Sequence, residues 1–80
     1  MAVPFGVIQE HHPRIAESIL LLWGHEECRI FLNRLIMDSR DGQRQGFSPF
    51  VAGAILHLLH EHDRIFPKFA PKTDTWHNSV

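Results

Sequence analysis

The chain has 80 residues, enough for one small domain, and a formal net charge of −1 at pH 7 with its seven histidines neutral. Without a strong basic excess it is not expected to bind nucleic acid. Its longest apolar run, residues 19–23, is far shorter than the roughly 20 residues that cross a membrane, so no membrane association is expected. A single cysteine and a start that lacks the features of a secretory signal indicate a cytoplasmic protein.

The first predicted helix follows a lead-in, residues 1–12, that is expected to be extended. Pro13 suits the first position of a helix, where its missing N–H is not needed. Apolar residues then recur at helical spacing, at Ile15, Ile19, Leu22 and Trp23. Gly24 is expected to end this helix, because glycine adopts the left-handed backbone conformation at little cost.

A second helix is predicted almost at once, with Glu26 and Glu27 in its first turn, where carboxylates complement the helix dipole. Its apolar stripe consists of Cys28, Phe31, Leu32, Leu35 and Ile36. Because the connection is short, the two helices are expected to be antiparallel neighbours. Residues 38–46 are polar and contain an Asp-Gly turn signal, so they are predicted to form an exposed loop.

The third helix has the clearest start, because Ser48 is a favourable N-cap and Pro49 a favourable first residue. Pro67 disfavours helix at the residue before it, so the helix is expected to end there. The tail, residues 67–80, is expected to be mobile. The sequence therefore predicts an all-α fold over residues 13–66, a three-helix bundle in which a helical hairpin packs against a third helix.

Three histidines of the third helix divide between two faces. His57, His60 and Glu61 share an exposed face at 100° per residue, so a zinc site formed by these three is the alternative function that the sequence leaves open. Arg64 lies on the same face and would repel a cation, and no zinc-binding motif is present. His62 instead falls within the apolar stripe and is expected to be a buried, neutral ring with one hydrogen bond, whose protonation destabilises the fold.

No set of residues in the sequence indicates catalysis. Cys28 lies on the apolar face of its helix, where an inert buried thiol is expected, and no nucleophile, base and orienting group occur together. We therefore expect a protein that is not an enzyme and that needs no cofactor, apart from zinc in the alternative.

Apolar residues outside the stripes are the more informative feature. Several of them on a thin domain suggest a patch that contacts a partner, and self-association would supply burial that so short a chain lacks. Folding back of the lead-in or the tail onto these residues is an equal alternative. The sequence thus predicts a small protein-interaction module, either a homodimer or an adaptor for another protein. The expected apolar contacts are Leu21, Ile30, Met37 and Leu56, and the expected polar contacts are Arg40 and Arg44.

Overall fold

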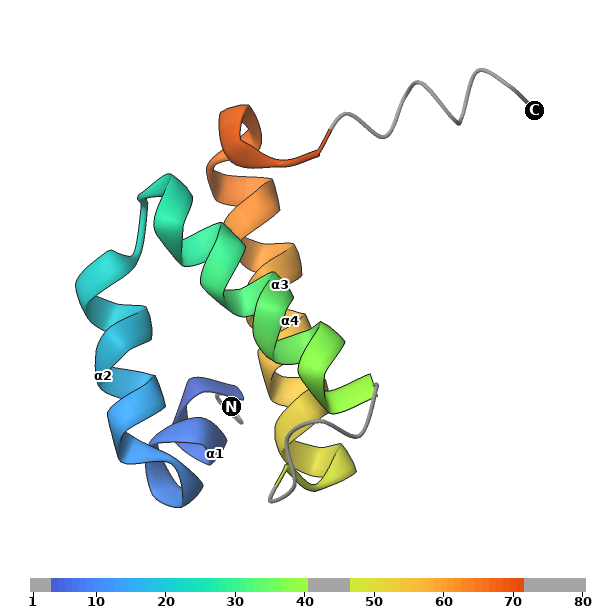
Figure 1. The fold of residues 1–80 in the computed structure, drawn as a ribbon. Coiled ribbons are helices and arrows are strands. Elements are labelled where there is room, and N and C mark those ends of the chain that lie inside the picture. The colour runs from blue at the N-terminus through green and yellow to red at the C-terminus, as the bar shows by residue number, and fades with distance from the viewer. Residues whose placement is uncertain (1–3, 41–46, 72–80) are drawn as a thin grey trace.

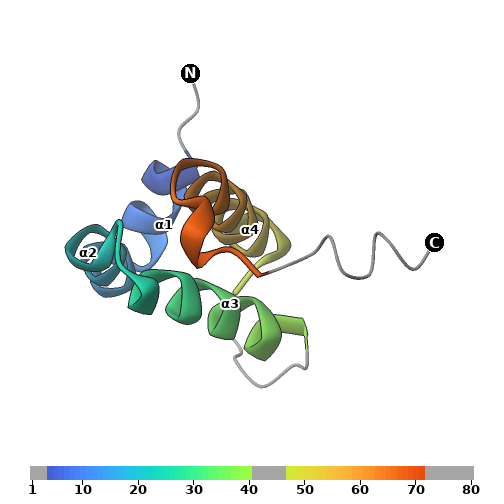
Figure 2. The same ribbon diagram turned by 90° about the horizontal axis from the view of Figure 1, so that it is seen from above.

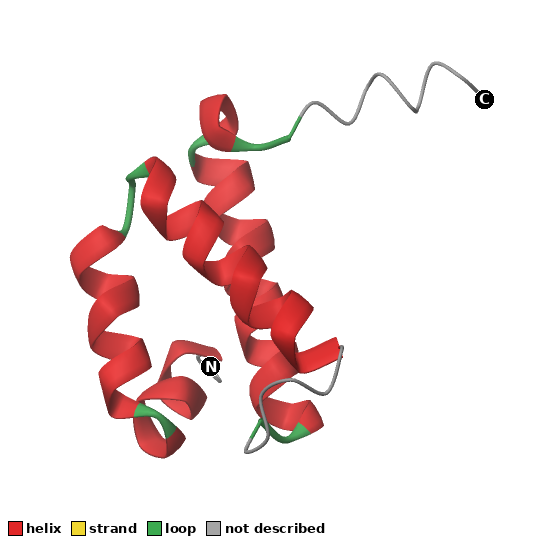
Figure 3. Cartoon of the chain, in the orientation of Figure 1, coloured by secondary structure: helices red, strands yellow, loops and turns green. Residues whose placement is uncertain are grey.

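The computed structural model describes residues 4–40 and 47–71, and every regular element in these two ranges is helical (Figure 3). The elements are α1 (Pro4–His11), α2 (Pro13–Leu22), α3 (Glu26–Arg40), α4 (Pro49–Ile65) and a short 3-10 helix, η1 (Pro67–Phe69). α3 crosses α4, and α1 lies between α2 and α4 at one end of the molecule (Figures 1 and 2). The predicted all-α class is confirmed, but four α-helices pack together where the sequence predicted three.

The additional helix, α1, replaces part of the lead-in that was expected to be extended over residues 1–12. Ile8 is completely buried, and Phe5 and Val7 pack against the core from the same helix. α1 continues almost directly into α2, because the amide of His12 donates to the carbonyl of Ile8 at 2.7 Å and the His12 carbonyl accepts from the next helix. The sequence argument missed α1 because eight residues give only two turns in which an apolar period can show.

The turn between α2 and α3 agrees with the sequence expectation. Gly24 has a φ of 88°, in the left-handed region that favours glycine. A side chain at this position would also meet the ring of Phe66, since a Cβ would lie 3.4 Å from the ring edge. Glycine is therefore favoured here by its backbone conformation, whereas the contact with Phe66 alone would leave room for a Cβ.

The ends of α3 and α4 show one confirmed prediction and two differences. The Ser48 hydroxyl accepts a hydrogen bond from the amide of Val51 at 3.2 Å, which confirms the predicted N-cap of α4. α3 runs to Arg40, so residues 38–40 are helical where a loop was expected, and the rest of that loop, residues 41–46, lies outside the described residues. The tail, expected to be mobile, begins with η1, which packs against α4, while residues 72–80 lie outside the described part.

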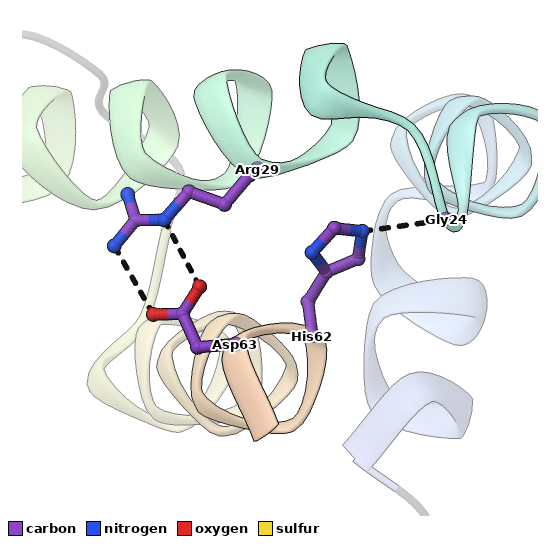
Figure 4. Close-up of polar contacts among 4 residues, drawn as sticks. All are labelled: Gly24, Arg29, His62 and Asp63. Carbon is purple, nitrogen blue, oxygen red and sulfur yellow. Dashed lines mark hydrogen bonds and ion pairs between the residues drawn. The ribbon is translucent and has the colours of Figure 1, made fainter. Parts of the chain in front are cut away.

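Most of the core lies between α3 and α4, and Ile8 of α1 and Ala16 and Ile19 of α2 pack beside it. α3 and α4 run antiparallel (Figure 1). A two-bond ion pair joins the start of α3 to the end of α4 (Figure 4). In it, the Arg29 guanidinium donates to both carboxylate oxygens of Asp63 at 3.1 and 3.2 Å. No helix among the described residues is long and apolar enough to cross a membrane.

Candidate interaction surface

The apolar run at residues 19–23 cannot be buried on one side of a helix. Successive residues turn by 100°, so five of them cover the whole circumference of α2. Leu20 is 61% exposed and Leu21 is 73% exposed, while the other residues of the run are buried or half-buried. Because α2 forms one edge of the bundle, no other described element covers its outer side (Figures 1 and 2). The two leucines therefore face solvent.

An apolar pocket of about 210 Å³ opens beside these leucines, between α1, α2 and α4. Its lining residues are all apolar: Phe5, Ile19, Leu20, Trp23 and Leu58. For comparison, an engineered apolar cavity of about 150 Å³ takes up benzene, so this pocket has room for one large apolar side chain. Its walls offer no polar group that would orient or activate a substrate. We call the pocket together with Leu20 and Leu21 the α2 face.

A second exposed apolar surface lies on the outer side of α3. Ile30 and Met37, seven residues apart, lie opposite the buried stripe of the helix and are each about half exposed. Leu56 precedes Asp63 by seven residues, or two turns, so the two lie on the same side of α4. Asp63 forms the ion pair with Arg29 of α3, so this is the side of α4 that borders α3. We call Ile30, Met37 and Leu56 the α3–α4 face.

The predicted contact residues therefore divide between two surfaces. Leu21 belongs to the α2 face, and the other three apolar residues belong to the α3–α4 face, all four of them exposed. Arg40 is the last residue of α3, and Arg44 lies outside the described residues, so neither arginine is placed relative to these surfaces. The four apolar residues that the sequence grouped as one contact surface thus lie on two, because they belong to different helices.

The candidate zinc ligands of α4 make other contacts. His57 and His60 are exposed, and the carboxylate of Glu61 accepts a hydrogen bond from the Arg64 guanidinium at 2.6 Å. This hydrogen bond lowers the pKa of Glu61. Among the residues that the structure describes, no group of three or more His, Cys, Asp or Glu side chains is placed to hold a metal ion. The zinc site stays a prediction that the pairing of Glu61 with Arg64 does not favour.

His62 is fully buried, as the sequence predicted, and joins α4 to the turn between α2 and α3 (Figure 4). Its Nε2 accepts a hydrogen bond from the Gly24 amide at 3.2 Å. The Trp23 ring and the imidazole form a T-shaped pair with 4.9 Å between ring centroids, and the rings of Phe66 and Phe69 lie at 4.7 and 6.3 Å. The structure thus confirms the sequence prediction that His62 is a core histidine with one hydrogen bond.

The hydrogen bond from Gly24 also fixes the protonation state of the ring. Because Nε2 accepts, the neutral imidazole carries its proton on Nδ1, which is buried and has no hydrogen-bond partner among the described residues. Burial lowers the pKa of His62; the Asp63 carboxylate opposes this effect and the Arg29 guanidinium adds to it. The neutral form is therefore the one that fits the fold.

The thiol of Cys28 is buried, as expected, and lies 3.9 Å from the carbonyl oxygen of Ile19, to which it donates. Burial raises its pKa to about 11. The side chain is therefore a protonated thiol at neutral pH, and it acts as a small apolar group that packs α3 against α2.

Sequence reasoning missed most of the α2 face. It identified Leu21 as exposed but assigned Trp23 to the core without a pocket, and it did not single out Leu20. Phe5 was missed because α1 was not predicted. The available signal was the unbroken run at residues 19–23, since a helix with one buried side cannot cover five consecutive apolar residues.

Comparison with known protein families, with curated proteins and with solved structures finds no match for this chain. Proposals about its function rest on its own residues.

Proposed function

We propose that this protein is a small protein-interaction module that contacts another protein chain through the α2 face. The observation that supports this function is the all-apolar pocket beside two leucines that are 61% and 73% exposed. Single exposed apolar residues are ordinary in soluble proteins. Adjacent ones that continue into an apolar pocket form a patch, and such patches mark the surfaces that bind partners.

The energetics of the α2 face favour binding a protein side chain. Burying one leucine contributes about 1.5–3 kcal/mol, and Leu20 and Leu21 are both available for burial. Binding energy in interfaces is concentrated where an anchoring side chain fills a desolvated pocket. A partner that inserts one large apolar side chain beside Trp23 and covers both leucines would bury a continuous apolar area.

The α3–α4 face supports an adaptor role within the same proposal. It shares no residue with the α2 face and lies on other helices, α3 and α4. One chain can therefore contact two proteins at once, with Ile30, Met37 and Leu56 as the apolar contacts of the second surface. Arg40 and Arg44, at and beyond the end of α3, are proposed to add polar contacts there.

The test uses a photo-crosslinking amino acid placed in the chain, at position 21 in one variant and at position 10 in a control. Glu10 is also exposed on a helix, α1, and belongs to neither of the two apolar surfaces. We expect a discrete protein adduct from position 21 in the cells that make the protein, and its loss when Leu20→Glu is added. Equal labelling from positions 21 and 10 would remove the α2 face from consideration.

The zinc alternative gives a different result in the same chain. The proposed module associates equally well with a chelator present. Association that requires added zinc and is lost in His57→Ala would instead favour the metal-responsive protein.

A further inference from the structure

We propose that the α2 face binds a second copy of this chain, in a symmetric dimer whose two α2 helices pack antiparallel around a two-fold axis. The inference rests on the proposed function, because it names the partner of the same surface. It requires that the surface be complementary to itself, as two-fold contacts always are. Both its apolar centre and its charged ends meet this requirement.

The apolar centre consists of Leu20 and Leu21. When the two-fold axis passes between these positions, Leu20 of each copy faces Leu21 of the other, and the four side chains cover one another. Leu20 also lines the pocket, so Leu21 of the second copy lies at the pocket mouth. The two exposed leucines of α2 are buried together with the pocket that adjoins them.

The charges at the two ends of the α2 face are of opposite sign. Arg14 is exposed in the first turn of α2, and Glu27 is exposed in the first turn of α3, just beyond the other end of α2. Glu27 lies about 200° around α3 from Arg29, and so on the side of the helix away from the ion pair with Asp63. It directly precedes Cys28, whose thiol contacts the Ile19 carbonyl of α2. Neither Arg14 nor Glu27 forms an ion pair among the described residues.

These charges select the antiparallel arrangement. At 1.5 Å per residue, Arg14 lies about 10 Å along α2 from the point between the two leucines. Antiparallel packing places the start of one α2 beside the end of the other, so that Arg14 of each copy faces Glu27 of the other. Parallel packing would place the two arginines together and is disfavoured by repulsion.

A second copy also fits the remaining properties of the surface. The net charge of −1 gives two copies little mutual repulsion. α2 lies at the edge of the bundle, where a second helix meets no other described element (Figure 2). Because α2 has 10 residues, its contact is short and belongs among the small interfaces, so we expect a dissociation constant in the micromolar range.

The test is sedimentation equilibrium of the full chain at pH 7.5 with a chelator, over roughly 5–500 µM, a range that suits a small interface. Leu21→Glu is expected to raise the dimer dissociation constant at least a hundredfold, since each copy loses a buried leucine and gains a buried charge. The matched control, Ile30→Glu, carries the same change on the α3–α4 face and should leave the constant within about threefold of the original.

Charge reversal tests the arrangement of the helices. Arg14→Glu and Glu27→Arg, made separately, should each weaken the dimer about tenfold, because two attractive contacts become repulsive. Combined in one chain, the two changes restore attraction across the two-fold axis, and the dissociation constant should return to within about threefold of the original. Circular dichroism of each variant checks that its helices are intact.

Each possible result either supports or contradicts the antiparallel dimer. A dimer that loses affinity with each single reversal and regains it with the pair supports the antiparallel arrangement. A dimer that is indifferent to these charges overturns it. A chain that stays monomeric over the whole range overturns the dimer, and a crosslink from position 21 to another protein then leaves the proposed function standing without the second copy.

Discussion

The ring of His62 makes the α2–α3 turn dependent on a single proton. Its Nε2 accepts the Gly24 amide only while that nitrogen is unprotonated. A proton there would place two donors against each other and leave a charge among the rings of Trp23, Phe66 and Phe69. The charged side chains that act on the ring are Arg29 on α3 and Asp63 on α4. On η1, the Lys68 ammonium lies over the Phe69 ring.

We predict that the free energy of unfolding decreases as the pH falls below about 6.5, the ordinary pKa of histidine, which applies to the unfolded chain. In the folded chain the pKa of His62 is lower, so between the two values the unfolded chain binds more protons. The loss is at most about 1.4 kcal/mol per pH unit and ends below the folded pKa. Urea unfolding at a series of pH values from 8 to 5 measures it.

Two glutamine variants separate this histidine from its neighbours. His62→Gln keeps an oxygen that can accept the Gly24 amide but does not titrate, so the pH dependence should largely disappear. His60→Gln removes an exposed histidine of the same helix and should leave it in place. The reverse pattern would show that the buried ring is not the group responsible.

At the scale of the helix, α1 shows how a short element gains its structure from packing. Helices of this length are marginal in isolation. α1 persists because Ile8 is buried between α2 and α4 and because its last turn continues into α2 through backbone hydrogen bonds. If residues 1–12 were an extended lead-in, no substitution in this segment would change stability by much.

Two substitutions in α1 are therefore expected to act in opposite directions. Ile8→Ala should lower the free energy of unfolding by about 2–5 kcal/mol, because it leaves a cavity in the core. Gly6→Ala should raise it by about 0.5–1 kcal/mol, since a Cβ at this exposed helical position meets no atom within 4 Å and alanine favours helix. Urea unfolding of both variants tests this. If neither substitution changes the free energy of unfolding, the segment is an extended lead-in and not a packed helix.

The elements also show what the sequence could predict. α4 was predictable because Ser48, Pro49 and Pro67 mark its ends with local backbone chemistry. The burial of His62 and Cys28 followed from helical periodicity alone. The pocket of the α2 face was not predictable, since it depends on how α1 and α4 are placed beside α2. That placement is a tertiary property which no local pattern carries.

At the scale of the whole molecule, the exposed leucines and the small core have a common explanation. A chain of 80 residues buries a modest share of its surface, and this one leaves two adjacent leucines outside its core. If a second copy covers them, folding and association are coupled, because the dimer forms only from folded chains. Stability then depends on protein concentration, which it does not for an isolated monomer.

We accordingly predict that the thermal midpoint rises with protein concentration once the concentration exceeds the dimer dissociation constant. In that range the free folded monomer grows only as the square root of total protein, so each tenfold step stabilises each chain by about 0.7 kcal/mol, half of the 1.4 kcal/mol that corresponds to a factor of ten. For a domain of this size that is a rise of about 3–5 °C per tenfold step. Calorimetry at two concentrations a hundredfold apart measures it. Leu21→Glu should give the same midpoint at both concentrations, whereas Ile30→Glu should keep the rise. If the midpoint of the unmodified chain does not change with concentration, no second copy covers its leucines.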